Sequence, residues 1–158
     1  MAAADIVRSY KALSAVERAF RSMKTVDLKV RPIHHHLAHR VRAHIFLCML
    51  AYYVEWHMRE AWRPLLFADE DQAAKATRDP VATAMRSSDA ERKAQTHTLS
   101  DGTPAHSFRT LLDELATIVR NTCRTTAASL TPTPTFTIIT QPNATQNRAL
   151  KLLDAIAL

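Results

Sequence analysis

Glycine is almost absent from this chain: its 158 residues include one, Gly102. Phosphate-binding loops, dinucleotide fingerprints and nucleophile elbows all need glycine where the backbone turns sharply or approaches a ligand. The sequence therefore excludes these sites, and with them most classes of nucleotide-dependent enzyme.

Cysteine is scarce as well. Cys48 and Cys123 have no metal-type spacing, and each lies in an apolar context that favours a buried free thiol in a reducing compartment. No stretch reaches the roughly 18 uncharged apolar residues that a membrane span needs. The first residues, 1–5, lack the cationic start and apolar run of a secretory signal. We therefore expect a cytoplasmic protein that does not enter a membrane.

Positive charge exceeds negative charge. The chain has 21 Lys and Arg against 15 Asp and Glu, a formal net charge of +6, which favours a polyanionic partner. Solvated helix faces explain some of these cations, but their clustering near the N-terminus favours contact with DNA phosphates. The clustered cations are Arg8, Lys11, Arg18, Arg21, Lys24, Lys29, Arg31, Arg40 and Arg42.

Apolar periodicity predicts a mainly α fold with one or two short strands. We expect three parts: residues 1–62, a first helix and a long packed helix; residues 63–104, an exposed, charged helical or flexible region; and residues 105–158, a helix, a strand and a short helix. The long helix should pack centrally against the first, because its segment 45–54 is nearly all apolar.

Finer features follow from local signals. The sequence predicts a short extended connector at 25–32, a flexible stretch at 87–104 with a turn at 100–104, and a linker at 131–134. Ser107 is expected to cap a helix that runs to about Cys123, and Asn143 or Thr145 to cap the last helix. The β-branched run at 135–140 predicts a strand.

One edge of the first helix combines a phenol, a carboxylate and cations. At 100° per residue, Tyr10, Leu13, Glu17, Arg21 and Lys24 fall within roughly 80° of the helix circumference. The adjoining face of the helix is apolar and is expected to be buried, so this edge would lie at the border of a core. A carboxylate held there suits a divalent metal near a phosphodiester. The alternative is an ordinary solvated i,i+4 pair of Glu17 with Arg21.

This spacing resembles the Tyr-Arg-Glu-Lys signature, Y-x2-R-x3-E-x6-K, of DDE transposases from the insertion-sequence-four group. Tyr10, Glu17 and Lys24 match in type and register, whereas Leu13 stands where the signature has Arg. Three later segments are also similar to such transposases: Val30–Ile33, Arg40–Leu50 and Gln146–Leu153.

The resemblance implies a ribonuclease H-like core that binds DNA and transfers phosphoryl groups with Mg²⁺. It implies roles for Glu17 as catalytic metal ligand, and for Tyr10 and Lys24 as DNA contacts. Arg21, a cation on the same edge of the helix, is expected to contact the DNA backbone together with Lys24. In such cores two Asp residues on strands precede the Glu. Here only Asp5 precedes Glu17, and it lies too close to be either of them.

The chain therefore resembles the helical C-terminal portion of a transposase whose main sheet is missing. Because one carboxylate cannot hold two Mg²⁺ ions, we expect no Mg²⁺ binding and no transposition by this chain alone. Expected partners are DNA and either a complementary fragment or a full-length transposase. The alternatives are a stand-alone DNA-binding or transposase-inhibiting protein, and a remnant that folds poorly.

A histidine cluster offers a rival site. His35 and His39 are spaced i,i+4, and His34 would join them from the preceding turn, so zinc binding is geometrically possible. No acidic or cysteine ligand lies nearby in the sequence, and Arg31, Arg40 and Arg42 surround the cluster. A basic surface facing phosphates is the favoured interpretation.

Overall fold

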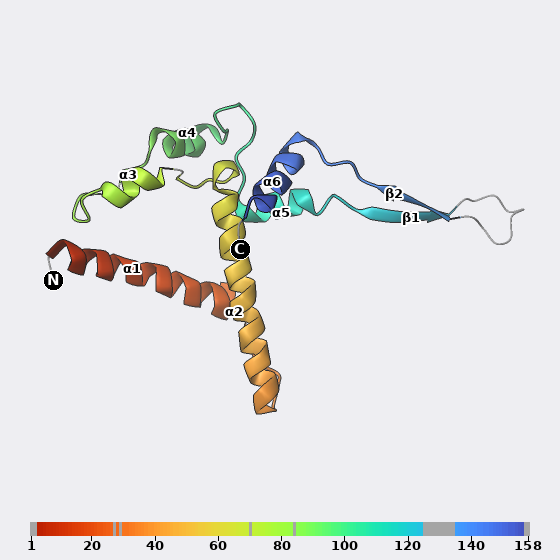
Figure 1. The fold of residues 1–158 in the computed structure, drawn as a ribbon, viewed down its shortest axis with the longest axis horizontal. Helices are drawn as coiled ribbons and strands as arrows, with labels where there is room; N and C mark the ends of the chain where they lie inside the picture. Colours follow the sequence, from red (N-terminus) through yellow and green to blue (C-terminus); the bar gives the residue numbers. More distant parts are fainter. Residues whose placement is uncertain are drawn as a thin grey trace, which may run out of the picture. The chain divides into compact units, whose positions relative to one another are not determined.

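The structure is a computed structural model, and it describes residues 3–26, 28, 30–69, 71–83, 85–124 and 135–156. The described chain is mainly helical and contains one two-stranded antiparallel hairpin (Figure 1). The helices are α1 (Ala3–Arg21), α2 (Ala38–Ala61), α3 (Gln72–Thr77), α4 (Ser88–Thr96), α5 (Phe108–Leu115) and α6 (Ala144–Asp154), with a π-helical turn η1 (Ser22–Val26) and a 3-10 turn η2 (Arg63–Leu65). The strands are β1 (Arg120–Arg124) and β2 (Thr135–Ile139).

The chain divides into two compact units. The first unit comprises Met1–Glu60 and Asp69–Glu91, and the second comprises Ala61–Ala68 and Arg92–Leu158. The predicted three-part division stays a prediction.

The first unit has no buried residue among those the structure describes. The apolar side chains of α1 and α2 are instead largely exposed, with Phe46 62% and Leu47 61% accessible. The expectation that segment 45–54 packs centrally against the first helix is therefore wrong. The apolar content of α2 is distributed around its circumference, so no single neighbouring helix would cover it.

The second unit contains all the described buried residues. Its core consists of Trp62, Leu65, Leu66, Leu99, Leu111 and Ala149. The Trp62 Nε1–H donates a hydrogen bond to the Ala149 carbonyl oxygen at 2.9 Å, and its ring lies 5.6 Å from that of Phe108. The indole therefore buries its apolar body while satisfying its one donor.

Side-chain caps fix the beginnings of two helices in the second unit. The Ser107 side chain accepts from the Thr110 backbone N–H, and the Asn143 side chain accepts from that of Gln146, each within a reciprocal capping box. The capping role of Ser107 is confirmed, and Asn143 rather than Thr145 caps the last helix.

Strand β2 confirms the predicted strand at 135–140, but its partner was not predicted. The helix expected to reach Cys123 ends at Leu115, and Arg120–Arg124 forms β1, which pairs with β2 so that Thr122 faces Thr137. Strand β1 lacks an alternation of apolar residues, because both faces of the hairpin are mainly exposed.

Two further loop predictions need correction. Part of the predicted flexible stretch 87–104 is the helix α4, in which Lys93 is buried, followed by buried Leu99. The turn at 100–104 is confirmed, and Gly102 occupies it with a φ of 80°. The predicted connector at 25–32 begins within η1, which includes Val26, and the linker at 131–134 lies outside the described residues.

Candidate functional site

Helix α1 presents the predicted site. The charges at its ends complement the helix dipole, with Asp5 in the first turn and Arg18 and Arg21 in the last turn. These charges stabilise both ends of the helix. The π-helical turn η1 follows directly and carries Lys24. Turns of this type are rare and concentrate at functional positions.

Three of the predicted site residues lie together. Glu17, Arg21 and Lys24 line one open groove, together with Val16 and Phe20. The Lys24 Nζ lies 5.5 Å from the centre of the Phe20 ring, within the range of a cation–π interaction. The groove thus combines one carboxylate, two cations and an aromatic wall.

Glu17 is exposed and makes no hydrogen bond or ion pair with another described residue. The ordinary i,i+4 pair with Arg21 is therefore not formed. The carboxylate stands in solvent beside cations rather than at the border of a core.

Tyr10 does not belong to the groove. It lies on the same helix nearer the N-terminus, and its side chain is 74% exposed. Leu13, which occupies the position of the signature Arg, is also exposed. The structure leaves both positions accessible to a large partner.

The donor set does not fit Mg²⁺. Each Mg²⁺ ion takes oxygen ligands in octahedral geometry, supplied in phosphoryl-transfer sites by several carboxylates and substrate phosphate. The groove offers one carboxylate between two cations. Nowhere in the described ranges do three His, Cys, Asp or Glu side chains gather as a metal site would require.

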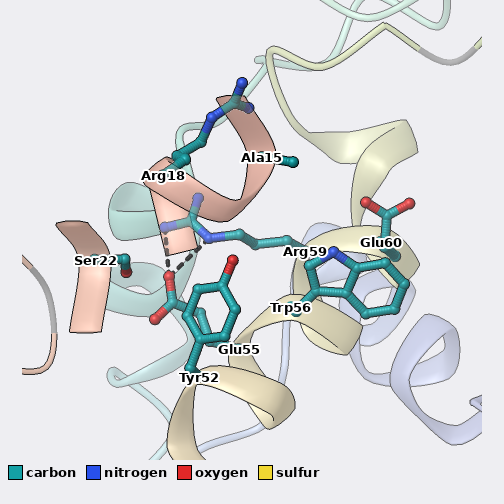
Figure 2. A pocket seen from close by; sticks show the side chains of 8 residues that line it. All are labelled: Ala15, Arg18, Ser22, Tyr52, Glu55, Trp56, Arg59 and Glu60. Carbon is teal, nitrogen blue, oxygen red and sulfur yellow. Dashed lines mark hydrogen bonds and ion pairs between the residues drawn. The ribbon is translucent and has the colours of Figure 1, made fainter. Parts of the chain in front are cut away.

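A second polar cavity lies near the groove, between α1 and α2. It measures about 370 Å³, and Figure 2 shows the side chains that line it. Glu55 and Arg59, both on α2, form an ion pair at its edge, with 2.7 Å between Arg59 Nη2 and Glu55 Oε1 (Figure 2). This pair satisfies the carboxylate, so Glu55 is not a free acid. Its i,i+4 spacing was the signal in the sequence.

The histidine cluster does not assemble as a metal site. The rings of His35 and His44 meet edge to face at 5.7 Å, and the His44 Nε2 lies 3.2 Å from the Val30 carbonyl oxygen. His34, His36 and His39 are exposed. The structure therefore uses His44 locally, within its own helix and connector.

Comparisons with protein-family models, with curated proteins and with solved structures find no match. Within the described ranges, no helix is both long enough and apolar enough to cross a lipid bilayer.

Proposed function

We propose that this chain is the C-terminal fragment of a DDE transposase of the insertion-sequence-four group and that it binds DNA through α1. The single observation that carries the proposal is that Glu17, Arg21 and Lys24 line one open groove. The signature spacing assigns a metal contact to Glu17 and a DNA contact to Lys24, and Arg21 is a neighbouring cation on the same edge of the helix. The ribonuclease H-like fold belongs to the same proposal.

The charges of the groove favour binding of DNA phosphates over metal-dependent catalysis. Arg21 and Lys24 supply two cations beside one carboxylate, a balance that attracts a polyanion and not a divalent cation. In the intact enzyme Mg²⁺ would supply charge stabilisation and an activated nucleophile. In this chain alone, Glu17 would remain a solvated carboxylate and transposition would be absent.

The test is binding of a labelled DNA duplex by the purified full chain, followed as salt is raised. We expect binding that weakens steeply with salt, because cations on the protein release counterions from the DNA. Arg21→Ala/Lys24→Ala should weaken binding, whereas Glu17→Ala should retain or strengthen it, because that change removes a negative charge from the groove.

A matched control removes two exposed cations elsewhere. Arg120→Ala/Arg124→Ala makes the same change in net charge on strand β1. If this control weakens binding as much as the α1 variant does, DNA binding depends on the overall positive charge, and the assignment of the DNA contact to α1 is wrong. If the wild-type chain binds no DNA at low salt, the proposal fails as a whole.

A second candidate function is inhibition of a full-length transposase. The apolar face of α1 favours it, because Ile6, Leu13, Val16 and Phe20 are each at least half exposed and available to another polypeptide. A complementary fragment that carries the missing Asp residues would bind to the same apolar surface of α1. Co-expression should lower the transposition frequency of a full-length enzyme, and Leu13→Asp/Phe20→Asp should abolish the effect.

A further inference from the structure

Helix α2 carries a regular stripe that the proposed function does not use. Its positions alternate in steps of three and four residues, which is the spacing of a coiled-coil seam. The stripe consists of His39, Arg42, Phe46, Met49, Tyr53, Trp56 and Glu60. We call it the α2 seam.

The centre of the α2 seam is apolar and uncovered. Phe46, Met49, Tyr53 and Trp56 are each about half exposed or more. These side chains also line an apolar groove of about 630 Å³, whose other wall includes Val16 of α1 and Met23 of η1. An uncovered apolar surface of this kind marks an interaction site.

The charges at the two ends of the seam are of opposite sign. Arg42 lies one helical turn before the apolar centre, and Glu60 lies one turn after it. They are 18 residues apart, or about 27 Å at 1.5 Å per residue. When a second copy of α2 lies antiparallel to the first, the Arg42 end of each seam therefore meets the Glu60 end of the other.

Reversal also matches the apolar layers. In the register that sets Arg42 against Glu60 of a second copy, Phe46 faces Trp56 and Met49 faces Tyr53 of that copy. Each layer then occurs twice, as an isologous two-fold interface requires. The layers join unlike charges, two aromatic rings, and a thioether with a ring, all of which are favourable pairs. A parallel arrangement would instead oppose like charges at both ends.

We propose that a second copy of this chain docks on the α2 seam through antiparallel pairing of the two α2 helices. The occupant follows from the self-complementary charge pattern, and the inference does not depend on DNA binding. The groove wall from α1 provides additional apolar contact beside the partner helix.

The first test is sedimentation velocity of the full chain over a range of concentrations, without DNA. The wild-type chain should dimerise, and Phe46→Asp should raise the dimer dissociation constant about 30-fold or more, as loss of a central anchor does. Leu47→Asp is the matched control, because Leu47 is as exposed as Phe46, at 61% against 62%, but lies off the seam. A monomeric wild-type chain, or equal effects of the two variants, would overturn the proposal.

The second test exchanges charges and does not touch the apolar layers. Arg42→Glu should weaken the dimer, because it sets two carboxylates together at each end. Arg42→Glu/Glu60→Arg should restore it, because each unlike pair is rebuilt in reverse. A double variant as weak as the single one would exclude this register. Circular dichroism would check that all variants keep their helices.

The third test fixes the direction of pairing. In a Cys48→Ser/Cys123→Ser background, Arg42→Cys and Glu60→Cys are made as separate chains and mixed under oxidising conditions. Antiparallel pairing predicts a disulfide between the two different chains. Parallel pairing predicts disulfides only within each variant, which would overturn the proposal.

Discussion

The indole Nε1–H of Trp62 donates to the carbonyl oxygen of Ala149, 87 residues further along the chain. Both residues are fully buried, so this bond joins the residue that precedes η2 to α6 within the core of the second unit. A buried carbonyl oxygen that loses its donor keeps the whole cost of desolvation. The stability of the second unit therefore depends on this contact.

Trp62→Phe should destabilise the second unit by about 1–3 kcal/mol, since it removes the donor and keeps most of the apolar body. Urea denaturation followed by far-ultraviolet circular dichroism would measure this change. Trp56→Phe is the control, because Trp56 is half exposed and is not one of the buried core residues. Equal losses in the two variants would contradict the assigned role of Trp62.

Gln146 should be the most sensitive position of α6. Its buried amide donates to the Glu114 carbonyl oxygen at 2.7 Å and to Thr117 Oγ1 at 2.9 Å, while its oxygen accepts from the Asn143 backbone N–H. Gln146→Leu should cost about 1–3 kcal/mol, because three polar groups each lose a hydrogen bond, among them the Asn143 backbone N–H, which loses its acceptor. Thermal unfolding would show it, with exposed Gln141→Leu as a neutral comparison.

Asp101 should carry a pH dependence. Hydrogen bonds from the Thr103 hydroxyl and backbone N–H, with a smaller contribution from Arg148, hold the pKa of this carboxyl below its ordinary value of 3.8. A lowered folded-state pKa means that the carboxylate stabilises the fold above 3.8 and that this contribution is lost as pH falls through the folded value. Nuclear magnetic resonance titration should find the lowered pKa, and Thr103→Val should return it toward 3.8. An unchanged pKa in that variant would exclude the hydroxyl as its cause.

The salt dependence of DNA binding should report the number of phosphate contacts. If Arg21 and Lys24 each neutralise one phosphate, Arg21→Ala/Lys24→Ala should reduce the slope of log K against log salt by about 2. The measurement is a titration series at several salt concentrations. A parallel shift of the line, with its slope unchanged, would mean that these side chains do not contact phosphate.

Local signals in the sequence predicted the helix beginnings and the second strand. Ser107 and Asn143 cap helices because their side chains reach backbone N–H groups only a few residues away. The strand at Thr135–Ile139 follows from its β-branched residues. The sequence signal for each of these features lies in residues that are close together in the chain.

Long-range pairing and burial were the features that the sequence could not show. Strand β1 exists because β2 supplies its hydrogen bonds, and Arg120–Arg124 alone has no strand pattern. The apolar run 45–54 predicted burial, yet the structure exposes it. The sequence shows that these residues are apolar, but it does not show whether another surface covers them. For the candidate site, helical spacing placed Glu17, Arg21 and Lys24 on one edge, and it could not show that Tyr10 lies outside their groove.

The concentration of every described buried residue in the second unit has a calorimetric consequence. A fully packed chain of 158 residues would show a heat-capacity increment on unfolding of about 2 kcal/mol/K. That increment scales with the apolar area that unfolding exposes to water. The heat-capacity increment of an isolated copy of this chain should therefore fall well below this value. Its stability curve should accordingly be shallow and respond weakly to cooling.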